Sequence, residues 1–220
     1  MTGFPRWIGP LVLVAALAGC GSDNSQSGTF RIVKGLLAEI TGLNKGGAAA
    51  PALSRADLQK VGTAVTVVEL QGLTMYMVPA GTNRGVTTWT SAEDRTISLR
   101  DGVMIASRGF GPDIMQAAAP TAAQLAAGRG TLQRSYFYLD GADQTRRFDY
   151  TCALSTVGSE TITVFGRQHT TRHVTETCRS AAVEFTNDYW FEGGNFIRKS
   201  KQLFVPEWGY ATISRVIDNP

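Results

Sequence analysis

The sequence predicts a mainly β fold: an antiparallel, strongly curved or barrel-like sheet with one or two short N-terminal helices. From Ala64 onward, short runs rich in Val, Ile, Thr, Tyr and Phe alternate with turns rich in Gly, Asp, Asn and Ser. Long helical patterns do not interleave with these runs, which favours antiparallel pairing. A sheet of so many strands must curl or close to bury one of its faces.

The first nineteen residues are predicted to be a signal peptide. They contain one basic residue, Arg6, and an apolar run from Ile8 to Leu17. That run is about half the ~20 residues that a membrane-spanning helix needs. The following Leu17–Cys20 segment resembles the lipobox of bacterial lipoproteins, in which small residues admit the peptidase and the cysteine thiol carries the lipid. We therefore predict lipidation at Cys20; an ordinary secretory signal with a chance cysteine is the alternative.

The chain is predicted to have three regions: the lipoprotein signal peptide 1–19, the lipidated cysteine with a polar tether 20–28, and a single β-rich domain 29–220. Several acyl chains, palmitate among them, would anchor the protein stably in a membrane. Gly21 and Ser22 follow the cysteine, and the absence of Asp directly after it resembles lipoproteins sorted to the outer membrane. The expected location is the outer membrane, with the domain facing the periplasm.

Two helices are expected before the sheet. Apolar residues at helical spacing over 29–43 predict an amphipathic helix. It either packs on the sheet or lies on the membrane surface, and its few basic residues favour the sheet. Ser54–Asp57 resembles an N-cap with an acidic third residue before a second short helix. Further on, the Ala-rich segment 114–128, interrupted by Pro120, predicts a short helix, a covering loop, or both.

The strands are predicted from β-branched and aromatic runs bounded by turn residues. Arg100–Gly102 is a good hairpin turn because its glycine accepts a positive φ. The candidate strands are 63–69, 73–78, 86–90, 96–99, 103–108, 132–139, 146–154, 161–166, 170–177, 181–187, 196–204 and 210–216.

Cys152 and Cys178 form an even pair in an oxidising compartment, which indicates a disulfide. Two buried free thiols or a metal pair are the alternatives, although a metal site needs more Cys or His nearby. With a separate strand over 161–166, a plain meander places the cysteines about 9.5 Å apart, too far for a disulfide. Either the strand ends curl, or the pairing order is not a plain meander.

Charge and motifs argue against several function classes. The formal net charge is +3, and its small basic clusters at 146–147 and 198–201 do not form a nucleic-acid-binding stripe, so we expect no nucleic-acid partner. The common hydrolase, metalloprotease, phosphate-loop and redox motifs are absent from the sequence. We expect no enzyme activity, no cofactor and no metal. His169 and His173 lie four apart on one strand face, which favours a polar face over a metal site.

Two stretches carry a family resemblance: Thr96–Ile114 (TISLRDGVMIASRGFGPDI), and Asn187–Phe191 (NDYWF) with Ser200–Gln202 (SKQ) after it. They resemble the YjbF-type lipoproteins, the group 4 capsule polysaccharide lipoprotein family, over about residues 29–217. The resemblance implies an outer-membrane-directed lipoprotein that takes part in exopolysaccharide or capsule production without assigned catalytic residues. It also implies an antiparallel, barrel-like sheet with few helices.

Two surfaces are candidates for contact with a polymer or a partner protein. In the loop after strand 103–108, Arg108 and Asp113 can bind sugar hydroxyls or a charged polymer group while Phe110 supplies a stacking face. The alternative is structural: the glycines shape a turn across which Arg108 and Asp113 pair. Near the C-terminus, Trp190 and Trp208 belong to an aromatic concentration that serves either binding or the core.

The leading hypothesis is therefore a non-catalytic, lipid-anchored accessory in exopolysaccharide or capsule production or secretion, with the polymer and secretion-machinery proteins as partners. The alternative is a lipid- or lipoprotein-binding carrier with a cavity inside a curved sheet. An enzyme acting on the polymer comes third, since it needs two carboxylates facing one cleft; the candidate pairs are Asp140 with Asp143, or Glu160 with Glu176.

Overall fold

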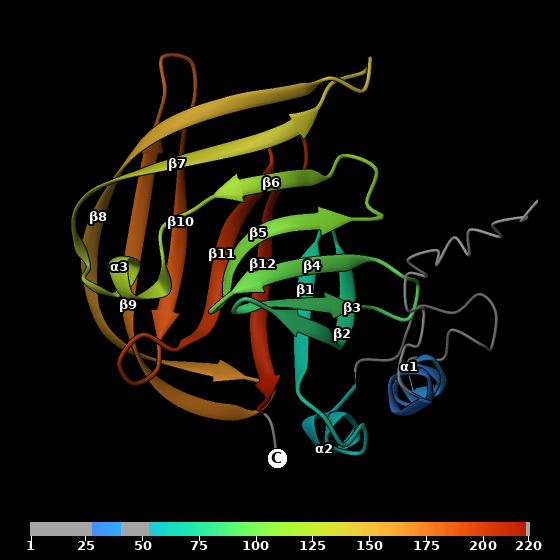
Figure 1. Cartoon of the computed structure of the whole chain (residues 1–220). Coiled ribbons are helices and arrows are strands. Elements are labelled where there is room, and N and C mark those ends of the chain that lie inside the picture. The colour runs from blue at the N-terminus through green and yellow to red at the C-terminus, as the bar shows by residue number, and fades with distance from the viewer. Residues whose placement is uncertain (1–27, 41–52, 219–220) are drawn as a thin grey trace, which may run out of the picture.

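The computed structural model describes residues 28–40 and 53–218 and contains three short helices and twelve strands (Figure 1). The helices are α1 (Gly28–Ile40), α2 (Arg55–Gln59) and α3 (Ala122–Ala126). The strands are β1 (Val65–Leu70), β2 (Leu73–Asn83), β3 (Val86–Thr90), β4 (Thr96–Arg100), β5 (Val103–Arg108), β6 (Ile114–Ala118), β7 (Arg129–Leu139), β8 (Thr145–Val164), β9 (Arg167–Arg179), β10 (Glu184–Phe191), β11 (Ile197–Val205) and β12 (Gly209–Ile217).

All twelve strands form one antiparallel sheet that is nearly closed into a barrel. The order is β5-β4-β3-β2-β1-β12-β11-β10-β9-β8-β7-β6, so strands consecutive in sequence are paired except β5 and β6, and the first strand pairs with the last. The two sheet edges, β5 and β6, are consecutive strands and lie beside each other (Figure 1). This confirms the predicted mainly β, barrel-like class.

The inside of the barrel is filled by two apolar clusters. One contains inward-facing aromatic and aliphatic side chains, among them Met77, Tyr136 and Phe204. The other forms where α3 packs Ala122 and Leu125 against the inner face of the sheet. The helix α3 follows β6 and precedes β7 in the chain, and in Figure 1 it lies beside β8 and β9. Each Å² of apolar surface buried stabilises the folded state by about 25 cal/mol, so these clusters are a main source of stability.

A third apolar cluster covers part of the outer wall. Val65 and Val67 of β1 point away from the barrel interior and pack with Leu37 of α1, Leu58 of α2 and Val164 of β8. The amphipathic helix predicted over 29–43 is therefore confirmed through Ile40, and its described residues pack on the sheet. Its predicted last three residues lie outside the described residues.

Short sequence motifs predicted the start of α2 and the turn between β4 and β5 correctly. Ser54 caps α2, and its hydroxyl accepts from the Asp57 N–H while the Asp57 carboxylate accepts from the Ser54 N–H. Gly102 has a φ of +89° in the turn between β4 and β5, as the hairpin prediction requires. The segment 114–128 contains α3 but begins as strand β6, so the helical prediction is only partly right.

The predicted break between strands 146–154 and 161–166 is wrong. The strand continues through Ser155–Glu160: with a β-bulge between Thr156 and Gly158, β8 runs as one strand of 20 residues. Cys152 and Cys178 consequently lie opposite each other on neighbouring strands and form a disulfide. A plain meander thus accommodates the predicted pair.

None of the described helices is long and apolar enough to cross a membrane. Cys20, the predicted signal peptide and most of the predicted tether lie outside the described residues.

Candidate binding site at the barrel mouth

Because the strands run up and down, the β5–β6, β7–β8 and β11–β12 connections all lie at one end of the barrel, which we call the mouth. These three connections enclose a hollow of about 300 Å³. The β5–β6 and β7–β8 connections project to the upper right in Figure 1. The residues that line the hollow are Pro112, Asp113, Tyr138, Leu139, Asp140, Arg146, Phe148, Val205, Pro206 and Glu207.

The β5–β6 loop is held rigidly by one carboxylate. Asp113 Oδ2 accepts from the Gly109 N–H at 2.9 Å, and Oδ1 accepts from the Ser107 hydroxyl at 2.7 Å. Gly109 and Gly111 have φ values of +88° and +96°, a region that favours glycine. Ser107 Oγ in turn accepts from the Ile114 N–H at 3.0 Å. The loop thus presents Pro112 and Asp113 to the hollow in one fixed arrangement.

Arg108 joins the two edges of the sheet. Its guanidinium donates to the carbonyls of Ile114 at 3.0 Å and Met115 at 3.2 Å on β6, and to its neighbour Ser107. Arg108 and Asp113 therefore serve separate hydrogen-bond sets within the loop. Phe110 is buried and its ring lies 5.1 Å from that of Phe204, so it packs in the core and presents no stacking face at the surface.

Aromatic rings form one wall of the hollow. Phe148 is 45% exposed, and its ring lies 5.8 Å from Tyr138, which stacks on Tyr136 at 5.7 Å. The Tyr138 hydroxyl donates to the Phe204 carbonyl at 3.2 Å. Burial, with a smaller contribution from the neighbouring phenols of Tyr136 and Tyr150, raises the pKa of Tyr138 well above its ordinary value. The wall therefore stays uncharged and offers a supported, half-exposed ring.

Polar groups surround these rings. Asp140 Oδ1 accepts from the N–H groups of Gln144 at 3.0 Å and Ala142 at 2.9 Å, and these bonds lower the pKa of Asp140. Arg146 lies 3.8 Å from Asp140, and Glu207 lines the hollow from the β11–β12 turn. An exposed ring with a few convergent polar groups is the usual composition of a small-ligand site.

A family model described as group 4 capsule polysaccharide lipoprotein gfcB, YjbF, matches residues 31–216. The chain belongs to this family. It is a family of capsule-associated lipoproteins and not a known enzyme family. The resemblance in Thr96–Ile114 and Asn187–Phe191 is thereby confirmed.

A solved structure also shares the fold. It is described as the hypothetical lipoprotein YmcC from Escherichia coli (K12), and it matches with a TM-score of 0.73 and 13% identity over 88% of this chain and 97% of that chain. At this identity the likeness shows the fold alone. The search of curated proteins found no match.

In this YjbF-family chain, the two tryptophans predicted as contact residues lie apart. Trp208, in the β11–β12 turn at the mouth, stacks on Phe204 at 6.2 Å, and its carbonyl accepts from the Gln71 side chain. Trp190 lies on the outer wall, where it is paired with His173 of β9 on one side and with Lys199 of β11 on the other. The His173 ring stacks on its ring at 4.6 Å, and Lys199 Nζ lies 5.4 Å from its ring centre. Trp208 thus belongs with the mouth, whereas the faces of Trp190 contact protein groups.

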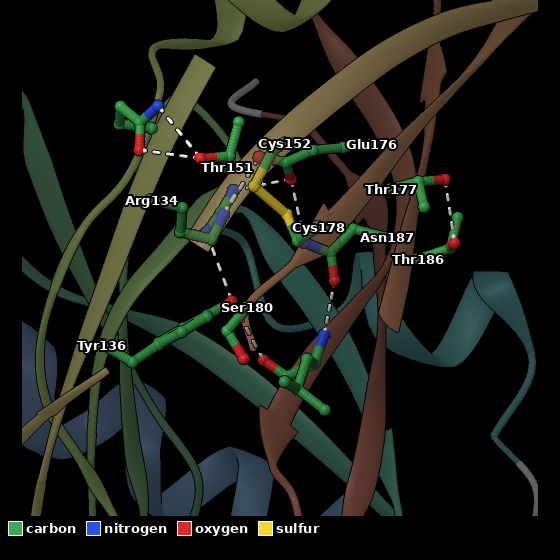
Figure 2. The surroundings of a disulfide bond; sticks show 12 residues. Arg134, Tyr136, Thr151, Cys152, Glu176, Thr177, Cys178, Ser180, Thr186 and Asn187 are labelled. Carbon is green, nitrogen blue, oxygen red and sulfur yellow. Dashed lines mark hydrogen bonds and ion pairs between the residues drawn. A yellow bond between two sulfur atoms is a disulfide. The ribbon is translucent and has the colours of Figure 1, made fainter. Parts of the chain in front are cut away.

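A buried polar network crosses the barrel interior beside the disulfide (Figure 2). Arg134 binds Glu176 through two hydrogen bonds, of 3.0 and 2.9 Å, and both side chains are completely buried. The hydroxyl of Tyr189 and the amide of Asn187 also donate to Glu176, at 3.0 and 2.9 Å. Burial raises the pKa of Tyr189 well above its ordinary value, which keeps this donor protonated.

This interior argues against the carrier alternative. Apolar side chains of the described residues pack inside the barrel, whereas a lipid carrier needs an open apolar cavity. Of the carboxylate pairs considered for an enzyme, Glu176 is buried in the interior and Glu160 lies on the outer wall, where it accepts from the Trp190 indole, so these two do not share a cleft. Asp140 lines the hollow at the mouth, and Asp143 is not among the lining residues. The disulfide also occupies both sulfurs of the Cys152, Glu176 and Cys178 group, the one metal-like cluster among the described residues.

Sequence reasoning missed the aromatic wall of the hollow. Phe148, Tyr150, Cys152 and Leu154 alternate along β8 and share one face of the strand, and the last three are buried. Phe148 shares that face but lies next to the β7–β8 turn, where the interior opens at the mouth. An aromatic residue at the turn-proximal end of an inward-facing row was the signal available in the sequence.

Proposed function

We propose that this YjbF-family lipoprotein is a non-catalytic accessory in capsule or exopolysaccharide production or secretion, and that it contacts the polymer at the barrel mouth. The observation that carries the proposal is the family match over most of the chain, joined to a hollow with an exposed, supported aromatic ring. Aromatic rings stack on sugar rings, and fixed carboxylates accept hydrogen bonds from sugar hydroxyls.

The mouth offers both kinds of contact at once. Phe148 provides the stacking face, while Asp140, Arg146 and Glu207 provide acceptors and a donor around it. The loop that carries Asp113 is fixed by its own hydrogen bonds, so little conformational freedom is lost on binding. Arg108 and Asp113 then act by fixing the shape of the mouth through their hydrogen bonds. Trp208 stabilises the mouth by stacking on Phe204.

Lipidation at Cys20 would hold the domain at the outer membrane, facing the periplasm. The lipobox-like Leu17–Cys20 segment supports this step, and the β-rich domain follows it in the chain. In this arrangement the domain meets the polymer, or secretion proteins that carry it, in the periplasm.

The test is secreted polysaccharide from cells that lack the protein, complemented with the intact chain, with Cys20→Ser or with Phe148→Ala. We expect export to fall in the deletion strain, the intact chain to restore it, and both variants to restore less. Phe196→Ala is the matched control, because Phe196 is a partly exposed aromatic residue in the β10–β11 turn at the opposite end. Unchanged export in the deletion strain would refute the polysaccharide role.

A direct measurement separates the accessory role from catalysis. Purified protein incubated with the polymer should bind it without changing its chain length. Shortened polymer, in a reaction that depends on carboxylates of the mouth, would replace the accessory role with a catalytic one.

A further inference from the structure

Two arginines whose guanidinium groups form no hydrogen bond or ion pair within the described part of the chain line one hollow at the opposite end of the barrel from the mouth. Arg55 begins α2, and Arg167 begins β9 at the tip of the β8–β9 hairpin. They line a hollow of about 340 Å³ together with Gln59, Gly62, Thr63, Ile217 and Asp218. Arg55 Nη1 is buried and has no hydrogen-bond partner within the described part of the chain. A buried donor without an acceptor is costly, which makes this atom a pointer to a missing ligand.

The surroundings of the hollow carry an excess of positive charge. Arg198 binds both oxygens of Asp218, at 3.1 and 2.9 Å, and also binds Glu192, while Arg215 lies 3.9 Å from Asp218. These two carboxylates are therefore already neutralised by Arg198 and Arg215. The guanidinium groups of Arg55 and Arg167 remain as two unbalanced positive charges.

The pKa of Arg55 agrees with this arrangement of charges. Burial lowers the pKa of Arg55, and the charges of Arg167 and Arg198 lower it further, against a smaller opposing effect of Asp218. A bound anion would reverse the electrostatic part of this effect.

Packing positions the two backbone segments that carry the arginines before any ligand arrives. The capping box of Ser54 and Asp57 fixes the start of α2, and Leu58 anchors the helix in the outer cluster. At the hairpin tip, Val164 packs in the same cluster and Phe165 meets the Tyr76 ring edge-on at 6.4 Å. The hollow is thus built by elements more than a hundred residues apart, and its geometry does not depend on the polysaccharide role.

We propose that the hollow between α2, the β8–β9 tip and the end of β12 binds a phosphate group. Guanidinium groups match phosphate oxygens with paired hydrogen bonds, and arginine is the usual residue for this recognition. The Thr63 hydroxyl and the Gln59 amide line the same hollow and add neutral donors. A phosphate monoester, with a charge of about −1.5 to −2 at neutral pH, matches two unbalanced arginines better than one carboxylate does.

The test is calorimetric titration of inorganic phosphate into the full lipidated protein in non-ionic micelles at low ionic strength. We expect saturable binding that weakens at least tenfold in Arg55→Gln and in Arg167→Gln. Arg100→Gln is the matched control, because the exposed Arg100 also lines a surface hollow with a second arginine, Arg84, and neither of these two has a buried unpaired nitrogen. No phosphate binding, or equal binding by all four proteins, would overturn the proposal.

A second arm identifies the source of the phosphate. Phosphatidic acid, a lipid with a phosphate monoester headgroup, should raise the melting midpoint of the intact protein in the micelles, but not of Arg55→Gln, if a lipid headgroup is the ligand; phosphatidylcholine, a phosphodiester, serves as the lipid control. Stabilisation by inorganic phosphate alone would support a soluble phosphorylated ligand instead. Binding of glucuronate with no binding of phosphate would overturn the assignment, because the site would then select a carboxylate.

Discussion

The barrel interior and the barrel mouth contain the same kinds of side chain, but these are hydrogen-bonded and buried in the interior and partly exposed at the mouth. Inside, Arg134, Glu176 and Tyr189 are hydrogen-bonded to one another and to Tyr136 and Asn187, and the disulfide lies beside them. At the mouth, Phe148 keeps almost half of its surface exposed, and Arg146 and Glu207 line an open hollow. The comparison indicates that polar groups satisfied within the chain stabilise the fold, whereas groups left open at a rigid rim are available to a ligand.

The largest effect is expected from breaking the buried ion pair. Glu176→Ala leaves the Arg134 guanidinium buried without its counter-ion, and we expect a loss of about 3–5 kcal/mol in the free energy of unfolding. Urea unfolding of the purified protein measures it. The double variant Arg134→Met with Glu176→Leu should recover much of the loss, because neither charge then remains unpaired. A small effect of Glu176→Ala would show that the network does not stabilise the fold.

The disulfide should have the next largest effect, again on stability and not on binding. Its cysteines are 26 residues apart, and closing a loop of this length stabilises the folded state by roughly 3–4 kcal/mol in the chain-entropy model. Cys152→Ala with Cys178→Ala should unfold at lower urea concentration yet keep its affinity for the polymer. Reductant should bring the unvaried protein close to the variant. A change in polymer affinity would show that interior and mouth are coupled.

At the mouth the expected pattern is the opposite. Phe148→Ala should weaken polymer binding about tenfold, which corresponds to ~1.4 kcal/mol. Because the ring is already half exposed, the free energy of unfolding should change by no more than about 0.5–1 kcal/mol. Binding isotherms and urea unfolding of the same preparations test both parts. Phe196→Ala should leave binding unchanged; equal losses in the two variants would remove the mouth from consideration.

The sequence predicted those features that depend on neighbouring residues. The Ser54 cap of α2 and the Arg100–Gly102 turn are local hydrogen-bond and φ requirements, and both are present. The curved antiparallel sheet followed from the number of strand-like runs without intervening helices. The disulfide could be predicted because two cysteines remain once Cys20 is assigned to the lipid. Their placement on neighbouring strands could not, because it depends on β8 continuing through Gly158.

The hollow and the buried ion pair could not be predicted in this way, because they depend on the closed barrel. Arg134 and Glu176 are 42 residues apart and meet only when β7, β8 and β9 lie side by side. The hollow joins three connections that become neighbours only when β1 pairs with β12 and closes the sheet. Burial also removed Phe110 from the surface, although its glycine-flanked position had favoured an exposed loop.

The smallest effect, and the finest test of how the mouth is held, concerns acid. Backbone N–H groups of Gln144 and Ala142 lower the pKa of Asp140 below its ordinary value of about 3.9. A carboxyl group with a lowered folded-state pKa contributes stability that is fully present above the unfolded pKa and is lost as the pH falls through the folded pKa. The melting midpoint of the unvaried protein should therefore exceed that of Asp140→Asn at pH 7, and the difference should shrink between about pH 4 and pH 2. The amide of the variant can accept the same N–H groups without titrating, so the comparison isolates the charge on Asp140. A difference that stays constant over this range would mean that Asp140 holds the β7–β8 turn through its shape and not through its charge.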